Sequence, residues 1–159
     1  MPTLLDSFNR SFAELSARTR KILEVTPAEL LYKRPRELPR TFAMFTVGEY
    51  VLRSAAAVEQ TFGGLTTRLW DDPFEWTLPE KLNTKALIIE YLDEVDKTRY
   101  DGFSFLRSDE SLTKSIAAPS TIKPISQVLI ETLSRSEHYL GRAYAVFQML
   151  SDEKLPRID

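Results

Sequence analysis

The sequence predicts an all-α domain, a helical bundle that occupies the whole chain, residues 1–159. Three observations predict this fold. Four long segments carry apolar residues at the spacing of an amphipathic helix. Most of the nine prolines fall between these segments, and no stretch has a convincing strand pattern. The length suits a single domain with one buried core.

The first two helices are expected at residues 4–24 and from Thr46 onward. The first segment alternates apolar residues with Arg and Glu at helical spacing. Thr46 and Glu49 fit a capping box, in which each side chain accepts from the other residue's backbone N–H. The consecutive glycines Gly63 and Gly64 predict a C-cap, so the second helix is expected to end there.

The third and fourth helices are expected at residues 84–106 and 124–150. Gly102 interrupts the third pattern, so a bend or an early end is expected there. The fourth segment is the longest uninterrupted helical pattern in the chain. These two segments complete a set of four helices that can enclose one core.

The connections are expected to hold short extra helices after Thr26 and Ser108. The stretch 71–79 and the stretch 115–123 are both expected to be loops. Three aromatic side chains near the first loop are expected to pack over one end of the bundle: Trp70, Phe74 and Trp76.

Composition excludes several classes of function. The formal net charge of −2 gives no field that would attract nucleic acid or an anionic membrane surface. Without any Cys, the chain can form no disulfide, thiolate metal site or Cys nucleophile. We see neither a signal peptide nor an apolar stretch of membrane-spanning length, and we expect a cytoplasmic protein.

Two stretches resemble the DinB/YfiT-like superfamily. Residues 46–53, Thr-Val-Gly-Glu-Tyr-Val-Leu-Arg, are similar to the start of that family's second helix, and Arg34-Pro35 before it also fits. Residues 135–142, Arg-Ser-Glu-His-Tyr-Leu-Gly-Arg, resemble its fourth-helix motif. The resemblance implies an up-down-down-up four-helix bundle and, as in many members, a homodimer. It also implies relatives that bind a divalent metal through three His and act as thiol transferases or hydrolases.

The metal-binding positions of the family carry other residues here. Aligning the two motifs puts Arg53, Arg135 and Tyr139 where the three His would stand, and His138 at a position that does not bind metal. Arg is always protonated and is a poor ligand, and one Tyr does not replace three imidazoles. We therefore expect no metal and no other cofactor.

We interpret the vacated position as a pocket for a small anionic ligand between the second and fourth helices. Two guanidinium groups and a phenol can donate to one acceptor. The candidate ligand-binding residues are Arg53, Arg135, Tyr139, Glu49, Tyr50, Glu131 and His138. A competing interpretation pairs each Arg with the Glu four residues before it on the same helix, which fills the site with salt bridges.

Three functions stay open at this point. The chain could bind a small ligand without a metal, it could be a metal-independent transferase or hydrolase, or it could be a structural or dimerisation module. An enzyme or binding protein needs a cavity that reaches solvent at Arg53, whereas a structural module needs a closed interior and an apolar surface patch.

Overall fold

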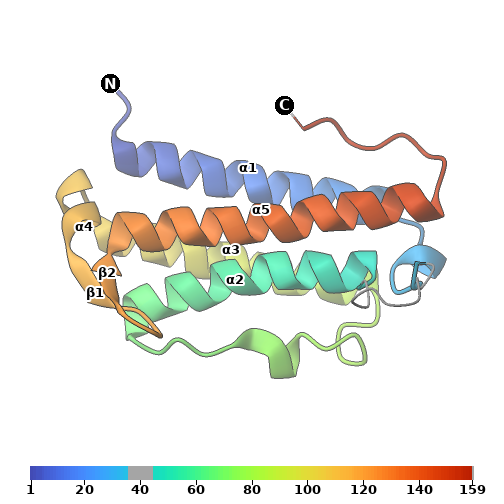
Figure 1. Ribbon diagram of the computed structural model, residues 1–159, viewed down its shortest axis with the longest axis horizontal. Helices are drawn as coiled ribbons and strands as arrows, with labels where there is room; N and C mark the ends of the chain where they lie inside the picture. Colours follow the sequence, from blue (N-terminus) through green and yellow to red (C-terminus); the bar gives the residue numbers. More distant parts are fainter. Residues whose placement is uncertain (36–44, 159) are drawn as a thin grey trace.

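The computed structural model describes residues 1–35 and 45–158. Four long helices form the bundle: α1 (Leu4–Val25), α2 (Val47–Thr67), α3 (Lys85–Leu106) and α5 (Ile125–Leu150). Short elements lie between them: η1 (Ala28–Leu30), η2 (Pro73–Trp76), α4 (Asp109–Thr113), β1 (Ser115–Ala117) and β2 (Ile122–Pro124). In Figure 1, α1 and α5 run in one direction, and α2 and α3 run in the other. The predicted up-down-down-up bundle is confirmed.

The helix starts follow the sequence closely. Thr46 caps α2, and Glu49 accepts in return from the Thr46 N–H at 2.8 Å, so the predicted capping box is present. Gly48 is required in this motif because a Cβ there would lie 2.5 Å from the ring of Tyr32. The Gly48 N–H also donates to the carbonyl of Leu31 at 2.8 Å. These contacts fix the start of α2 against the segment that precedes it.

Two glycine predictions were wrong. α2 does not end at Gly63 and Gly64 but continues to Thr67. It is Arg68 that adopts the left-handed conformation at the C-cap, with φ 64°. A Cβ at Gly64 would lie 2.3 Å from the ring of Trp70, so this glycine makes room for an indole. Gly102 does not end α3 either, and its missing side chain lets α3 approach α2 closely.

Two connections also differ from expectation. Residues within 115–123 form an antiparallel pair, with Ser115 opposite Pro124 and Ala117 opposite Ile122. Three-residue strands are too short for an alternating pattern to predict them. Of the three aromatic residues expected over the end of the bundle, Trp70 packs against the core, whereas Phe74 and Trp76 keep 57% and 42% of their surface exposed.

α2 and α5 pack most extensively, and buried hydroxyls fix their register. The Ser54 hydroxyl donates to the Ser136 carbonyl at 2.9 Å, and the Ser136 hydroxyl donates to the Ser54 carbonyl at 3.0 Å. Further along the same interface, the hydroxyls of Thr61 on α2 and Thr132 on α5 share a hydrogen bond of 2.6 Å. All four residues are buried, so these groups have few other partners and hold the two helices at one relative position.

The apolar faces of the four helices meet in one core. Phe12 of α1, Phe62 of α2 and Phe103 of α3 form an aromatic cluster, with ring centroids 5.0–5.9 Å apart. The opposite faces of the helices carry charged residues. Within residues 1–35 and 45–158, no helix is long and apolar enough to cross a membrane.

Gly102→Ala tests the close approach of α3 to α2. The new Cβ would lie 2.4 Å from Cδ1 of Phe62, which is fully buried and cannot move aside. We expect the free energy of unfolding to fall by about 1–2 kcal/mol, because overpacking outweighs the gain in helix propensity. Urea unfolding measures the change. Gly63→Ala is the control, since its Cβ meets open space and should stabilise the protein by about 0.5–1 kcal/mol. Equal gains for both variants would contradict this account.

Candidate functional site

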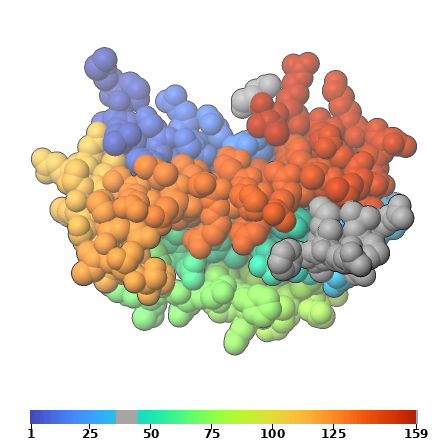
Figure 2. Space-filling view, in the orientation of Figure 1, coloured from blue at the N-terminus to red at the C-terminus, as the bar shows by residue number. Residues whose placement is uncertain are grey.

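A cavity of about 460 Å³ lies between α2, α5 and the connection from residue 68 to residue 84. Because α2 and α3 run in the same direction, this connection must return along the bundle, a distance of about 30 Å. In Figure 1 it runs along α2 on the side away from α5, so α2 forms the middle of the cavity lining and the connection and α5 form its two sides. In Figure 2 the connection forms the lower edge of the face that α5 crosses.

The connection is fastened to the helices at both ends. Near its start, the Trp70 ring packs on Gly64, and the Gln60 side-chain amide donates to the Trp70 carbonyl at 3.2 Å. Near its end, the Tyr32 hydroxyl donates to the Leu82 carbonyl at 2.5 Å. Burial raises the pKa of this phenol, so it stays protonated as a donor. Both ends of the connection that forms the outer wall of the cavity are therefore held against the rest of the protein.

A carboxyl group below the connection provides a third attachment. Glu59 of α2 accepts from the Tyr91 hydroxyl of α3 at 2.5 Å. Burial raises the pKa of Glu59, and hydrogen bonds from Tyr91 and Trp76 partly oppose that rise. Trp76 belongs to η2, so the Glu59 carboxyl interacts with the middle of the connection as well as with α3.

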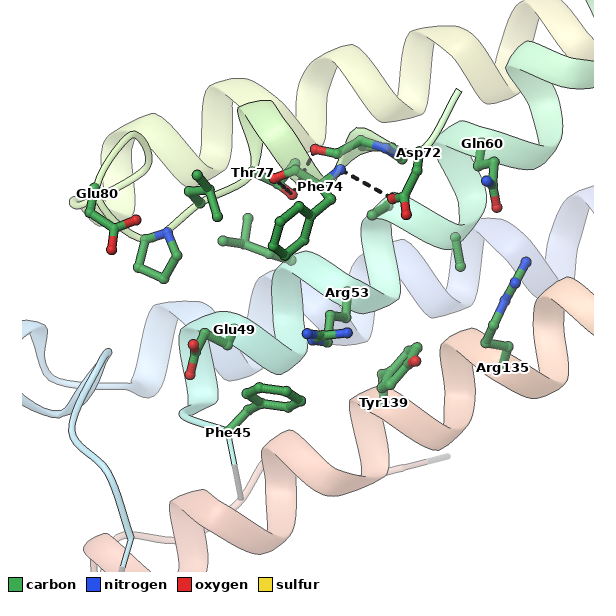
Figure 3. Close-up of a pocket in the computed structure, with 16 residues that line it drawn as sticks. Phe45, Glu49, Arg53, Gln60, Asp72, Phe74, Thr77, Glu80, Arg135 and Tyr139 are labelled. Atoms are coloured by element: carbon green, nitrogen blue, oxygen red, sulfur yellow. Dashed lines mark hydrogen bonds between the residues drawn. The ribbon is translucent and has the colours of Figure 1, made fainter. Parts of the chain in front are cut away.

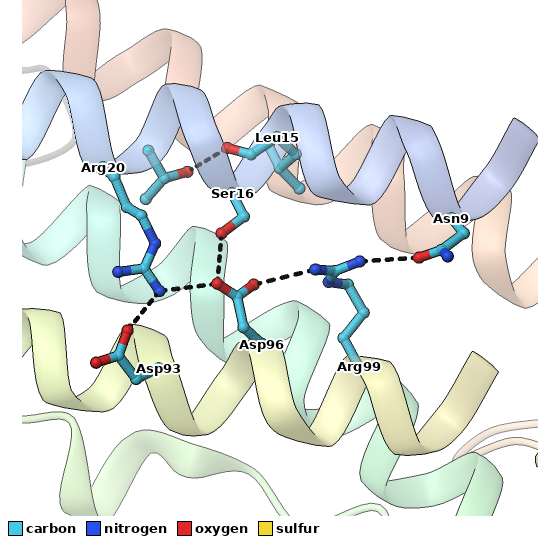
Figure 4. A network of polar contacts seen from close by, with 8 residues as sticks. Asn9, Leu15, Ser16, Arg20, Asp93, Asp96 and Arg99 are labelled. Carbon is cyan, nitrogen blue, oxygen red and sulfur yellow. Dashed lines mark hydrogen bonds and ion pairs between the residues drawn. The ribbon is translucent and has the colours of Figure 1, made fainter. Parts of the chain in front are cut away.

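Arg53 projects from α2 into the cavity (Figure 3). Its guanidinium carbon lies 4.1 Å from the centre of the Phe45 ring, a cation–π contact. Glu49 also lines the cavity, but one of its oxygens accepts from the N–H and the hydroxyl of Thr46. In the part of the chain that the structure describes, Arg53 forms no ion pair with Glu49. The expected salt bridge at this spacing is absent there because Glu49 serves as the helix cap.

Arg135 and Tyr139 line the same cavity from α5. The Glu131 carboxylate is engaged elsewhere, by the Lys123 ammonium at 2.7 Å and the Gln127 amide at 3.0 Å. These hydrogen bonds, chiefly the one from Lys123, lower the pKa of Glu131, and the charge of Arg135 contributes least. Within residues 1–35 and 45–158, Arg135 has no ion-pair partner. Glu131 and Arg135 also line a neighbouring cavity of about 270 Å³.

Three sequence candidates lie outside the large cavity: Glu131, which lines only the neighbouring one, Tyr50 and His138. Tyr50 is 1% exposed, and its ring stacks beneath Tyr139 with centroids 6.4 Å apart. The Tyr50 hydroxyl accepts long hydrogen bonds from the Phe45 N–H and from Arg142. His138 is exposed and accepts from the Arg142 guanidinium at 2.9 Å. Tyr50 thus supports the floor beneath Tyr139, and His138 does not reach the cavity.

Sequence reasoning missed the residues that form the outer wall. Phe45 precedes α2, whereas Asp72, Phe74 and Glu80 belong to the connection. The Asp72 side chain caps η2 by accepting from the Phe74 N–H at 3.1 Å. The signal available in the sequence was the long aromatic and proline-containing stretch, whose position depends on the directions of α2 and α3.

The donor set around the cavity does not suit a metal. Arg53, Arg135 and Tyr139, which the motif alignment predicts at the metal-binding positions, line this cavity together. Two permanent cations oppose the binding of a third. Among the residues that the structure describes, no three His, Cys, Asp or Glu side chains are grouped so that they could hold a metal ion.

The arrangement defines a class of protein: an up-down-down-up four-helix bundle with a solvent-facing cavity beside its second and last long helices. A more particular likeness comes from solved structures. The chain is similar to a DinB-like protein from Bacillus cereus, with a TM-score of 0.72 over 100% of both chains and 18% sequence identity. The chain therefore has the DinB-like fold, which confirms the predicted resemblance at that level. No protein-family model matches the sequence, and neither does any curated protein.

Arg135→Ala separates a ligand-facing arginine from a structural one. Because Glu131 is bound by Lys123, we expect the free energy of unfolding to change by less than about 0.5 kcal/mol. Arg18→Ala is the control, since Arg18 makes a two-pronged ion pair with Glu137 across α1 and α5. That variant should lose about 1 kcal/mol. A loss of about 3 kcal/mol for Arg135→Ala in urea unfolding would identify a buried salt bridge instead.

Proposed function

We propose that this protein binds a small molecule with a carboxylate or similar anionic group in the cavity between α2 and α5, without a metal. The observation that carries the proposal is the pair Arg53 and Arg135, which line one cavity and have no carboxylate partner among the described residues. Guanidinium groups are planar donors suited to carboxylate and phosphate oxygens. A ligand acceptor between them would accept hydrogen bonds from guanidinium groups that no described carboxylate binds.

The surroundings support a ligand-binding role. The cavity volume of about 460 Å³ lies within the range of small-molecule sites. Tyr139 adds a hydroxyl, and Phe45 holds the Arg53 guanidinium by its ring face. Apolar residues of α2 and the connection complete the lining, including Leu52, Ala56 and Leu78. Sites that combine apolar side chains with convergent polar groups are typical of small-molecule binding.

Binding of hexanoate, acetate and phosphate tests the proposal. At a concentration about 100 times its Kd, a ligand stabilises the folded state by about 2.7 kcal/mol, which raises the Tm by several degrees in a chain of this size. We expect such a rise with at least one of the three anions, relative to chloride at equal ionic strength. Differential scanning fluorimetry measures it.

Matched variants locate the binding site. Arg53→Gln and Arg135→Gln should each remove most of the rise in Tm, whereas Arg10→Gln should keep it. Arg10 is exposed on α1, a helix that contributes no residue to the described lining. If all three variants respond like the unaltered protein, the anion binds elsewhere and the proposal fails.

Metal content tests the second half of the proposal. We expect zinc, nickel and manganese at background level in tag-free protein purified without chelator, because Arg53 and Arg135 place fixed positive charge in the cavity. Inductively coupled plasma mass spectrometry measures the content, with a parallel sample loaded with zinc and then dialysed as control. A near-stoichiometric metal in either sample would support a metal-dependent enzyme and overturn the metal-free assignment.

A further inference from the structure

The charges around the cavity do not match those of a simple anion. Its described lining holds two cations, Arg53 and Arg135, and three carboxylates, Glu49, Asp72 and Glu80. None of these carboxylates forms an ion pair with a residue of the described part of the chain. An anion that neutralised the two arginines would leave the three negative charges facing it without a counter-charge. A ligand with both signs of charge meets a more complementary lining.

Two of the three carboxylates lie toward one end of the cavity. In Figure 3, Glu49 and Glu80 lie toward that end, Arg135 and Gln60 toward the other, and Arg53 between them. Asp72 lies on the Gln60 side of Arg53, where its carboxylate accepts from the Phe74 N–H at 3.1 Å. The order along α2 agrees, since Glu49, Arg53 and Gln60 follow one another on that helix. Tyr32 links the two segments that carry Glu49 and Glu80, since its ring lies against Gly48 of α2 and its hydroxyl donates to the Leu82 carbonyl of the connection.

The acidic end has carboxylate oxygens available for a ligand. Glu49 uses one oxygen in the α2 cap. Glu80 is exposed on the connection. The Tyr32 hydroxyl donates to the Leu82 carbonyl and so holds this part of the connection near α2. Glu49 and Arg53 are about 6 Å apart along the helix axis, four residues at 1.5 Å each. Arg135 lies beyond Arg53 in Figure 3, so a molecule that binds both Arg135 and the acidic end needs separated charges.

From these observations we propose that the ligand is a zwitterion with separated charges. Its carboxylate binds Arg53, Arg135 and Tyr139, and its protonated amine binds Glu49 and Glu80. Apolar methylene groups between the charges contact the lining residues Leu52 and Leu78. The ligand class is an ω-amino acid or a compound with the same spacing of amine and acid. This inference rests on the proposed function and adds the second recognition element.

Isothermal titration calorimetry with compounds of equal chain length tests the inference. The probes are 6-aminohexanoate, hexanoate and hexylammonium. We expect 6-aminohexanoate to bind about tenfold more tightly than hexanoate, which corresponds to about 1.4 kcal/mol. Hexylammonium should bind most weakly, because its alkyl end reaches the arginines without an acceptor. Glycine, whose charges are adjacent, should bind no more tightly than acetate.

Variants assign the amine to the acidic end. Glu80→Gln should lower the affinity for 6-aminohexanoate to about that for hexanoate and leave hexanoate binding unchanged or stronger. Glu75→Gln is the matched control, since Glu75 is an exposed carboxylate of the same connection and does not line the cavity. It should change neither affinity. Arg135→Gln should weaken the binding of both compounds, because both carry the carboxylate.

The possible failures are distinguishable. Hexanoate binding as tightly as 6-aminohexanoate would overturn the zwitterion and leave the anion site standing. Tight binding of glycine would overturn the required separation of charges, and tight binding of hexylammonium would show that the acidic end binds an amine unaided by the arginines. If neither carboxylate binds, and the anions of the thermal test also give no response, the proposed function itself fails.

Discussion

The register between α2 and α5 is the constraint on which the candidate site depends. Ser54 and Ser136 exchange hydroxyl-to-carbonyl hydrogen bonds of 2.9 and 3.0 Å within the buried interface. Small side chains let the two backbones approach, and the low local dielectric makes each satisfied bond valuable. Arg53 precedes one serine and Arg135 precedes the other. The bond that fixes the helices therefore brings the two arginines to the same cavity, and a shift of one helical turn would separate them.

The second constraint is topological. Parallel α2 and α3 require a connection that returns along the bundle, and that connection supplies the outer wall of the cavity. It is held by packing of Trp70 on Gly64, by the Glu59 carboxyl group, and by the Tyr32 bond to the Leu82 carbonyl. In a bundle whose helices simply alternate in direction, short turns would replace this segment and the groove would be open. The cavity is thus a product of helix direction as much as of side-chain choice.

Charge is distributed so that the arginines remain available. Both glutamates that could neutralise them through a spacing of four residues have other roles, Glu49 as a helix cap and Glu131 as the partner of Lys123. Arg53 is held by an aromatic ring, which fixes its position, and its donors form no ion pair with a carboxylate in residues 1–35 and 45–158. Guanidinium groups placed in this way suit the recognition of an acid better than the binding of a metal.

The sequence by itself determined the bundle, the bounds of three of its long helices, the start of α2, and the positions of Arg53, Arg135 and Tyr139 in the family motifs. These follow from helical periodicity, capping chemistry and local spacing, all of which act within one segment. It misjudged Gly64 and Gly102, because the reason for a glycine there is a ring from another element, Trp70 in one case and Phe62 in the other. Only the tertiary structure decided that Glu131 is engaged by Lys123, that His138 and Tyr50 lie outside the cavity, and that Asp72, Phe74 and Glu80 line it. The physical reason is that helical spacing lists the partners a charge can reach, whereas packing and the path of the connection determine which partner it meets.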